Sequence, residues 1–173
     1  MKRSIAVREA TEADADSALA LRAAVFAETE FMLWEPAEFK DTAADEAARI
    51  KRISAAPNSV FLLATEGNAL LGFCAAMGGH VNRLRHSASL ALGVLRSHWG
   101  EGVGFALLEG VEDWSKSAGV VRLELTVHTS NVRAVNLYLR RGFQVEGLRR
   151  SSLLVNGRYV DEYLMSKLRA DEA

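Results

Sequence analysis

Apolar side chains recur every three or four residues in four parts of the chain, a spacing that places them on one face of an α-helix. The first part follows Thr11 and Asp14, which form a Thr-x-x-Asp variant of the capping box, so its helix is expected to begin near Glu12. The four predicted helices cover residues 12–26, 41–53, 103–114 and 131–138.

Other segments are apolar throughout or alternate between apolar and polar residues, as strands do. Residues 121–127 alternate strictly, with Arg122, Glu124 and Thr126 on the polar face. Hairpins are expected around Glu66-Gly67-Asn68 and around Asn156-Gly157, a pair that favours a two-residue turn. The predicted strands are residues 4–8, 60–64, 70–77, 87–94 and 121–127 and the two arms of 144–168.

The order of these elements predicts a mixed sheet with helices on both faces. A helix connects the strands 87–94 and 121–127, so these two strands are expected to run parallel.

Alternating glycines lie where the strand 87–94 gives way to a helix. Gly100, Gly102 and Gly104 let the backbone adopt positive φ and let an anion approach, while the first N–H groups of the helix point at that anion. The loop therefore indicates a phosphate cradle, with an ordinary strand-to-helix turn as the alternative. A Walker loop needs Gly-Lys followed by Ser or Thr, but Phe105 follows Gly104 here. A dinucleotide-binding loop needs an acidic residue at the end of the next strand, but Glu124, near the right distance, lies in the middle of a strand.

Asn131, Ala134 and Tyr138 are spaced i, i+3 and i+7, so they share one helical face. With the glycine loop, Leu-Glu-Leu-Thr-Val at 123–127, Gly142-Phe143 and Glu146-Gly147, the chain resembles the GNAT N-acetyltransferase family over nearly its whole length. The resemblance implies a single GNAT domain over residues 1–173. It also implies an α/β (α+β) fold whose sheet of about seven strands splays between 87–94 and 121–127.

The resemblance further implies an acyltransferase that uses acetyl-CoA as cosubstrate. A primary amine of a small molecule or peptide attacks the thioester directly in a ternary complex. Tyr138 would contact the cosubstrate and act as the general acid that protonates the leaving thiolate, since a phenol with a pKa near 10 stays protonated at neutral pH. The alternative for Tyr138 is a helix tyrosine packed on the core. The other implied contacts of acetyl-CoA are the backbone of Leu92, Gly93 and Val94, the N–H groups of Gly100, Glu101, Gly102, Val103 and Gly104, and the Asn131 side chain.

Two positions depart from the family pattern. Trp99 precedes Gly100, which leaves open whether a side chain helps at the phosphates. Thr126 stands where ribosomal-protein acetylases of this family carry a glutamate, so a general base must come from elsewhere or water must serve. His86 and His128 lie near the cleft mouth by topology, but both are interpreted as surface histidines.

The segment 28–36 is apolar without helical or strand periodicity. It either caps the core between two helices or, as the resemblance implies, lines the acceptor pocket, with Phe31, Trp34 and Glu35 as candidate contacts. Glu28, Glu30 and Glu35 are candidates to meet a cationic amine, with a solvated charge cluster as the equal alternative.

Composition narrows the function classes. The 173 residues fit one domain, and 49% hydrophobic with 25% charged residues is typical of a globular protein. A net charge of −1 gives no electrostatic case for nucleic-acid or membrane binding, which leaves small molecules or peptide amines as partners. A non-catalytic acyl-CoA-binding module and a nucleotide-dependent enzyme are the competing hypotheses.

Cysteine and histidine usage adds further expectations. Cys74 is the single cysteine, which excludes an internal disulfide and is interpreted as a small core residue. The histidines lack partners at metal-ligand spacing, so no metal site is expected. The N-terminus lacks the apolar core of a signal peptide, so a cytoplasmic protein is predicted. The family resemblance implies that the protein could form a homodimer.

Overall fold

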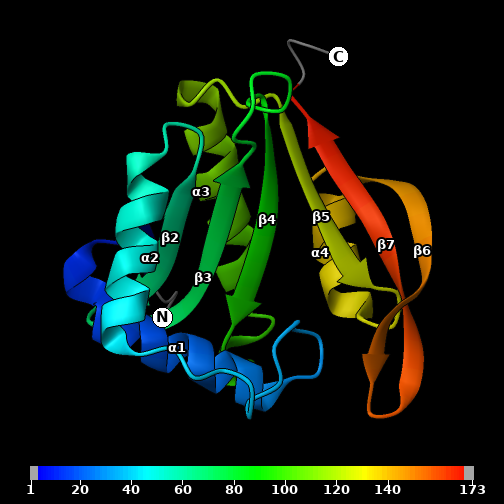
Figure 1. The fold of residues 1–173 in the computed structure, drawn as a ribbon, viewed down its shortest axis with the longest axis horizontal. Coiled ribbons are helices and arrows are strands. Elements are labelled where there is room, and N and C mark those ends of the chain that lie inside the picture. Colours follow the sequence, from blue (N-terminus) through cyan, green and yellow to red (C-terminus); the bar gives the residue numbers. More distant parts are fainter. Residues whose placement is uncertain (1–3, 170–173) are drawn as a thin grey trace.

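The chain forms one seven-stranded mixed sheet in the order β1-β2-β3-β4-β5-β7-β6, with helices on both faces (Figure 1). The structure, a computed structural model, describes residues 4–169. The predicted fold class is therefore confirmed, while the outer ends of the predicted 1–173 domain lie outside the described residues. The strands are β1 (Ala6–Glu9), β2 (Val60–Glu66), β3 (Ala69–Gly78), β4 (Ser87–Val94), β5 (Arg122–His128), β6 (Gln144–Val155) and β7 (Arg158–Leu168). The α-helices are α1 (Ala15–Glu28), α2 (Ala43–Ala55), α3 (Val103–Ser117) and α4 (Val132–Arg140), and short 3-10 turns η1 (Glu12–Asp14) and η2 (Arg96–His98) precede α1 and α3.

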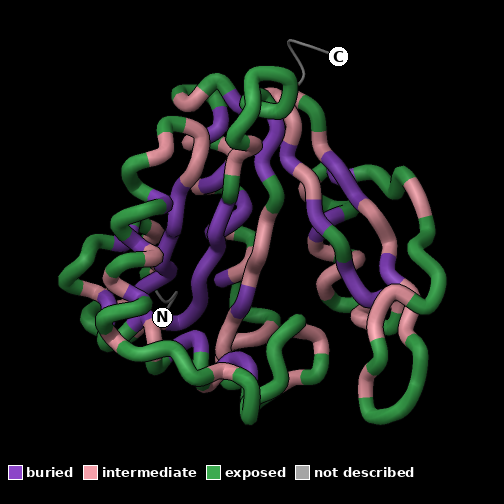
Figure 2. The backbone as a smooth tube through the Cα atoms, viewed as in Figure 1, coloured by how far each residue is buried: buried purple, intermediate pink, exposed green. Residues whose placement is uncertain are grey.

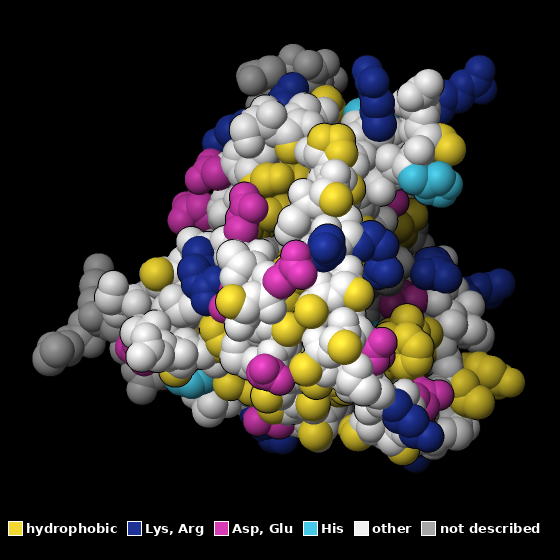
Figure 3. Space-filling model, turned by 60° about the vertical axis from the view of Figure 1, so that its left-hand side comes forward, with side chains coloured by type: hydrophobic (Ala, Val, Ile, Leu, Met, Phe, Trp, Pro, Cys, Tyr) yellow, Lys and Arg dark blue, Asp and Glu magenta, His cyan; other side chains and the backbone are white. Residues whose placement is uncertain are grey.

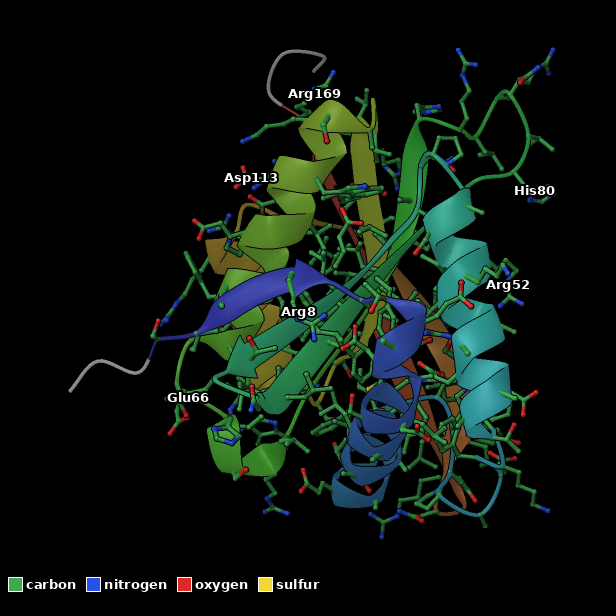
Figure 4. The ribbon with its side chains drawn as sticks, turned by 90° about the vertical axis from the view of Figure 1, so that its left-hand side faces the viewer. Arg8, Arg52, Glu66, His80, Asp113 and Arg169 are labelled. Carbon is green, nitrogen blue, oxygen red and sulfur yellow. The ribbon has the colours of Figure 1, made fainter. Side chains whose placement is uncertain are left out.

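Polar caps set where the first helices begin. The Asp14 carboxylate accepts the Thr11 N–H at 2.8 Å and the Thr11 hydroxyl at 3.0 Å, and it also pairs with Arg8, which lies beside η1 in Figure 4. The predicted start near Glu12 is thus the 3-10 turn that leads into α1. A second Thr-x-x-Asp box, Thr42 and Asp45, begins α2 slightly later than the sequence pattern indicated.

The sheet separates two apolar cores. Figure 2 shows the buried residues concentrated along its central strands. Helices α1 and α2 pack with Phe61, Leu63 and Phe73 on one face, and α3 and α4 cover the other face. On β5, Leu123 and Leu125 belong to the α3 core, whereas Thr126 is exposed, so the predicted alternation is confirmed. The opposite face of β5 therefore carries its polar side chains.

Helices α1 and α2 are locked together by a buried ion pair. Arg22, on α1, pairs with the fully buried Glu46 on α2, and its guanidinium lies 4.8 Å from the centroid of the Phe39 ring. Removing one partner from such a pair typically costs about 3–5 kcal/mol. Through Phe39, Arg22 also contacts the loop that joins these helices.

Strands β4 and β5 pair over only part of their length. Their parallel register runs from Ser87 opposite Arg122 to Ser89 opposite Glu124, although β4 continues to Val94 and β5 to His128. Figure 1 shows the two strands moving apart beyond that point. The predicted splay is confirmed, and residues 90–94 and 125–128 are called the β4–β5 divergence below.

A polar network closes the paired end of this divergence. Ser89 Oγ donates to Glu124 Oε1 at 3.3 Å, and Arg122 pairs with both Glu124 and Glu146. Ser166 Oγ also donates to Glu146 Oε1, at 2.6 Å, so the network links β4, β5, β6 and β7. The polar face of β5 thereby holds together the strands that separate further along.

The surface mixes charges of both signs. Figure 3 shows basic and acidic side chains interspersed on the face that it presents. Within residues 4–169, no helix combines the length and apolar character needed to cross a bilayer.

The Glu146 network makes a testable acid-range prediction. The guanidinium of Arg122, followed by the Ser166 hydroxyl, lowers the pKa of Glu146 to about 2. A carboxyl with a lowered pKa stabilises the fold above its unfolded pKa, about 4.3, and this contribution is lost as the pH falls toward 2. Carboxyl ¹³C NMR should give a Glu146 midpoint near 2, and Arg122→Gln should move that midpoint toward the ordinary value.

The charge-matched control is Arg158→Gln, at the other end of β7. This variant should leave the Glu146 midpoint in place. An Arg122→Gln midpoint equal to the wild-type value would show that Arg122 does not hold the carboxylate.

Candidate active site

The glycine loop has the backbone geometry of an anion cradle. Gly100 and Gly102 adopt φ of +80° and +91°, and Gly102 is the residue before α3. A Cβ added at either glycine would meet no heavy atom within 4 Å. The first N–H groups of α3 precede Ala106, whose N–H donates to the Gly102 carbonyl, so they lack intrahelical acceptors. Open space and free donors thus coincide at the positive end of the helix dipole.

Gly104 serves a different purpose from the other two glycines. It lies inside the first turn of α3, and an added Cβ would come within 2.9 Å of the Leu137 side chain on α4. Its small size therefore lets α3 and α4 approach each other. The expectation that all three glycines make room for an anion thus applies to Gly100 and Gly102, whereas Gly104 makes room for α4.

The end of β4 runs directly into this loop. Leu92, Gly93 and Val94 pair on one side with β3, opposite Cys74, Phe73 and Gly72. On the other side they border the β4–β5 divergence, where β5 supplies no ladder partner. Main-chain groups along this edge are the kind that pair with an extended amide-bearing ligand.

Tyr138 lies buried on α4 at the α3 side of the divergence. Its side chain is 7% exposed and makes an edge contact with Phe143 at 5.6 Å between ring centroids. Burial, with a smaller contribution from nearby Cys74, raises the pKa of the Tyr138 phenol above its ordinary value. Burial and Cys74 act on the phenol without a hydrogen bond to its hydroxyl from the described residues, 4–169. Tyr138 is thus a protonated donor with its hydrogen still available.

Asn131 is engaged within its own helix. Its Oδ1 accepts the Ala134 N–H at 3.2 Å and so caps α4. Asn131 is thus the residue before α4 and not part of its first turn. Its side-chain oxygen is occupied, which leaves its amide nitrogen as the group that can face a ligand.

The loop between α1 and α2 meets the β6–β7 hairpin. Asn156 Nδ2, at the hairpin turn, donates to Glu30 Oε2 at 3.1 Å. In Figure 1 the loop and the hairpin both lie at the end where β4 and β5 are apart. Of the predicted acceptor contacts in the loop, Phe31 packs edge-on against His128 with ring centroids 5.6 Å apart.

Other parts of the loop do not behave as the core-capping alternative predicts. Trp34 is 50% exposed and Glu35 is also exposed, so neither side chain covers the core. Glu28, a candidate for meeting an amine, accepts the Arg96 N–H at 2.7 Å and so anchors the turn after β4. The structure therefore brings Phe31 to the divergence and leaves Trp34 and Glu35 on its outer side.

Comparisons with known proteins agree with this architecture. The sequence profile of the acetyltransferase (GNAT) family matches residues 25–143. The chain belongs to the GNAT acetyltransferase family. It is 32% identical to N-alpha-acetyltransferase RimI of Mycobacterium tuberculosis over 162 residues, which covers 91% of this chain and 88% of that protein.

Solved GNAT structures show the same fold. An acetyltransferase of the GNAT family from Streptococcus pneumoniae superposes with a TM-score of 0.92 at 30% identity, covering 96% of this chain and all of that one (100%). A phosphinothricin acetyltransferase from Sinorhizobium meliloti, solved in complex with acetyl-CoA, superposes with a TM-score of 0.84 at 19% identity, covering 97% and 89% of the two chains.

The Trp99 side chain makes contacts in this GNAT chain that the sequence alone did not indicate. Its Nε1 donates to the Val94 carbonyl at 2.8 Å, which ties the cradle to the end of β4. The Arg133 guanidinium stacks on the indole at 4.4 Å, and that of Arg96 lies 5.8 Å from it. The tryptophan thereby brings two positive charges beside the cradle.

His128 corrects a prediction. The histidine interpreted as a surface residue is only 4% exposed, and its Nε2 has no hydrogen-bond partner within the described residues. Leaving a buried polar nitrogen unpaired costs about 1–3 kcal/mol. The alternation of residues 121–127 extended by one position would have placed His128 on the same face as Thr126, but nothing in the sequence signalled its burial.

Two further groups complete the description. Burial raises the pKa of the Cys74 thiol to about 12, which fits a core residue rather than a thiolate nucleophile. Over the span 4–169, no cluster of three or more His, Cys, Asp or Glu residues is arranged to hold a metal ion.

Paired glycine variants test the cradle in this GNAT protein. Gly102→Ala adds a methyl group at the loop, and it should weaken CoA binding measured by calorimetry by at least tenfold because the ligand must occupy that space. Gly119, in the turn after α3, also has positive φ (+67°) and open space around an added Cβ. Gly119→Ala thus matches the backbone strain, and it should lower the melting temperature similarly while retaining CoA affinity. Equal CoA affinities for the two variants would contradict the cradle.

Proposed function

We propose that this GNAT protein is an acetyl-CoA-dependent N-acetyltransferase that acts on a primary amine of a small molecule or peptide. The observation that carries the proposal is the continuous path from the unpaired edge of β4 into the cradle at the start of α3. Such a path suits a long ligand with amides at one end and a pyrophosphate at the other. The Sinorhizobium structure shows a member of this family with acetyl-CoA bound.

The chain's own groups divide the work of binding. The main-chain groups of Leu92 and Gly93 and the Val94 N–H would pair with the pantetheine amides, since the Val94 carbonyl accepts the Trp99 indole N–H. The N–H groups of residues 100–104 would bind the pyrophosphate. Arg133, held over Trp99, would add positive charge beside those phosphates. The Asn131 amide nitrogen would donate to the pantetheine end, since its oxygen caps α4.

The reaction needs no protein nucleophile. Bound acetyl-CoA supplies an activated thioester, whose carbonyl carbon an amine can attack directly. Backbone N–H groups at the divergence would stabilise the developing oxyanion. Tyr138 would donate its proton to the leaving thiolate.

The acceptor side of the proposal follows from the loop and hairpin contact. Phe31 packs on His128 at the end of β5, and its neighbour Glu30 accepts a hydrogen bond from Asn156 at the hairpin turn. The Mycobacterium relative is named an N-alpha-acetyltransferase, so a peptide α-amine is one candidate acceptor class. The single domain, the homodimer and the cytoplasmic location stay predictions.

Release of free thiol from acetyl-CoA tests the activity. The wild-type protein is assayed with a panel of four amines: L-methionine, a tetrapeptide amide that begins with alanine, spermidine and kanamycin. The panel represents amino acids, peptides, polyamines and aminoglycosides. At least one should release thiol in proportion to acetylated amine detected by mass spectrometry. Tight CoA binding without turnover of any amine would instead identify a non-catalytic acyl-CoA-binding module.

Tyr138→Phe tests the proton donor. The variant keeps the ring and its contact with Phe143 but deletes the hydroxyl, so kcat should fall by about 10²–10⁴-fold. The dissociation constant of acetyl-CoA should change little. Tyr159→Phe, which removes a hydroxyl from a ring that is 74% exposed, is the matched control and should keep the wild-type kcat.

An unchanged kcat in Tyr138→Phe, with chemistry shown to be rate-limiting by single-turnover measurement, would make Tyr138 a packing residue. The thiolate would then take its proton from water.

A further inference from the structure

His128 lies at the open end of the β4–β5 divergence. Strand pairing stops at Ser89 and Glu124, and His128 is four residues further along β5, about 13 Å away along the strand. On the facing strand, the main chain of Leu92 and Val94 lies three to five residues beyond Ser89. His128 is therefore about as far from the last paired residues as the part of β4 that leads into the cradle.

The imidazole faces away from Tyr138's side of the sheet. It shares a strand face with Glu124 and Thr126, whereas Leu123, Leu125 and Val127 belong to the α3 core. The α1–α2 loop reaches this face, because Phe31 packs on the His128 ring. A group here would meet an acceptor that arrives on the side opposite α3 and α4.

The surroundings of His128 are polar but already paired. Glu162, directly opposite His128 on β7, is 6% exposed and accepts Ser152 Oγ at 2.5 Å, with Arg149 of β6 at 3.4 Å. On the loop, Glu30 next to Phe31 accepts from Asn156. The Nε2 of His128 is the buried side-chain atom that stays without a partner in the described structure.

The proposed reaction requires a proton acceptor that the strand does not otherwise provide. An α-amine has a pKa near 8 and an alkyl amine near 10, so both arrive largely protonated at neutral pH. Thr126, on the same face of β5, cannot take up that proton. An imidazole exchanges protons in this pH range.

Resting on the proposed function, we propose that His128 Nε2 binds the acceptor nitrogen and takes its ammonium proton. The freed lone pair then forms the C–N bond with the thioester carbonyl carbon, and the C–S bond breaks with its electrons on sulfur. The thiolate sulfur takes the proton of the Tyr138 hydroxyl. The attacking nitrogen then gives a second proton to the Tyr138 phenolate, and His128 releases its proton to water. Each turnover thus releases one proton.

His128→Gln tests this assignment, because the amide can form hydrogen bonds but cannot take up a proton. With the panel amine that the wild-type protein acetylates fastest, kcat/KM for the amine at pH 7 should fall by about 10²–10⁴-fold. The KM for acetyl-CoA should stay unchanged. Added imidazole should partly restore the rate of His128→Ala, in which the ring is missing.

The pH profile separates a proton-accepting role from a structural one. In the wild-type protein, kcat/KM for the amine should stay high at neutral pH, although the acceptor arrives largely protonated there. In His128→Gln the deficit should shrink as the pH approaches the pKa of the free amine, since the acceptor then arrives deprotonated. A purely structural role would lower the rate by the same factor at every pH.

The control is His80→Gln on the exposed connector between β3 and β4, where Figure 4 places His80 at the periphery of the molecule. This variant should match wild type in rate and pH profile. A His128→Gln profile parallel to that of wild type, or an unchanged rate, would overturn the proposal while leaving the acetyltransferase activity established. Absence of thiol release in the wild-type protein would instead refute the proposed function.

A measurement on the wild-type protein keeps the test informative if His128→Gln fails to fold. Imidazole ¹⁵N shifts, recorded with CoA bound, should show the Nε2 signal of His128 moving when the same amine is added, with His80 unmoved. A His128 signal insensitive to the amine would overturn the assignment.

Discussion

The organisation of this protein depends on where main-chain pairing between β4 and β5 stops. Beyond Ser89 and Glu124 the two parallel strands have no ladder bonds between them, so main-chain N–H and C=O groups on one edge of β4 lack a strand partner, and the Val94 carbonyl accepts the Trp99 indole N–H instead. Such groups are costly unless something pairs with them, which makes the divergence a place prepared for an extended ligand. The Arg122 network at the paired end holds the strands together, so the separation begins at a defined point.

The two sides of the divergence supply different chemistry. On one side, α3 and α4 contribute the N–H groups of a helix start and a buried phenol, both of which suit an anion or a developing negative charge. On the other side, the polar face of β5 contributes the unpaired nitrogen of His128 beside Phe31. A thioester placed between them would be approached by donors from one side and by its acceptor from the other.

The N-terminal helices matter to the site through the loop that they carry. The buried pair of Arg22 and Glu46 holds α1 against α2, and the Glu28 contact with the Arg96 N–H joins the end of α1 to the turn after β4. The hairpin at Asn156 then closes on the loop from the far end of the sheet. Segments distant in sequence thus define one rim of the β4–β5 divergence.

The sequence by itself determined the elements, the turn chemistry and the backbone conformation of the glycine loop, because these depend on a few neighbouring residues. The Asn156-Gly157 turn needs positive φ at both positions, and both have it, at 49° and 75°. Gly102 likewise adopts the left-handed conformation that its place before α3 suggested. The family resemblance added the splay and the Tyr138 role, of which the splay is confirmed and the role stays a prediction.

Only the tertiary structure decided which side chains are occupied and which stay available. Glu28 bonds to a residue that lies far along the chain, Gly104 makes room for Leu137, and Trp99 gathers Arg96 and Arg133. His128 is buried because Phe31 and β7 come to it from distant parts of the sequence. Burial and pairing are set by residues that periodicity cannot relate, so a histidine that looked like a surface residue is instead a buried group with an unpaired nitrogen.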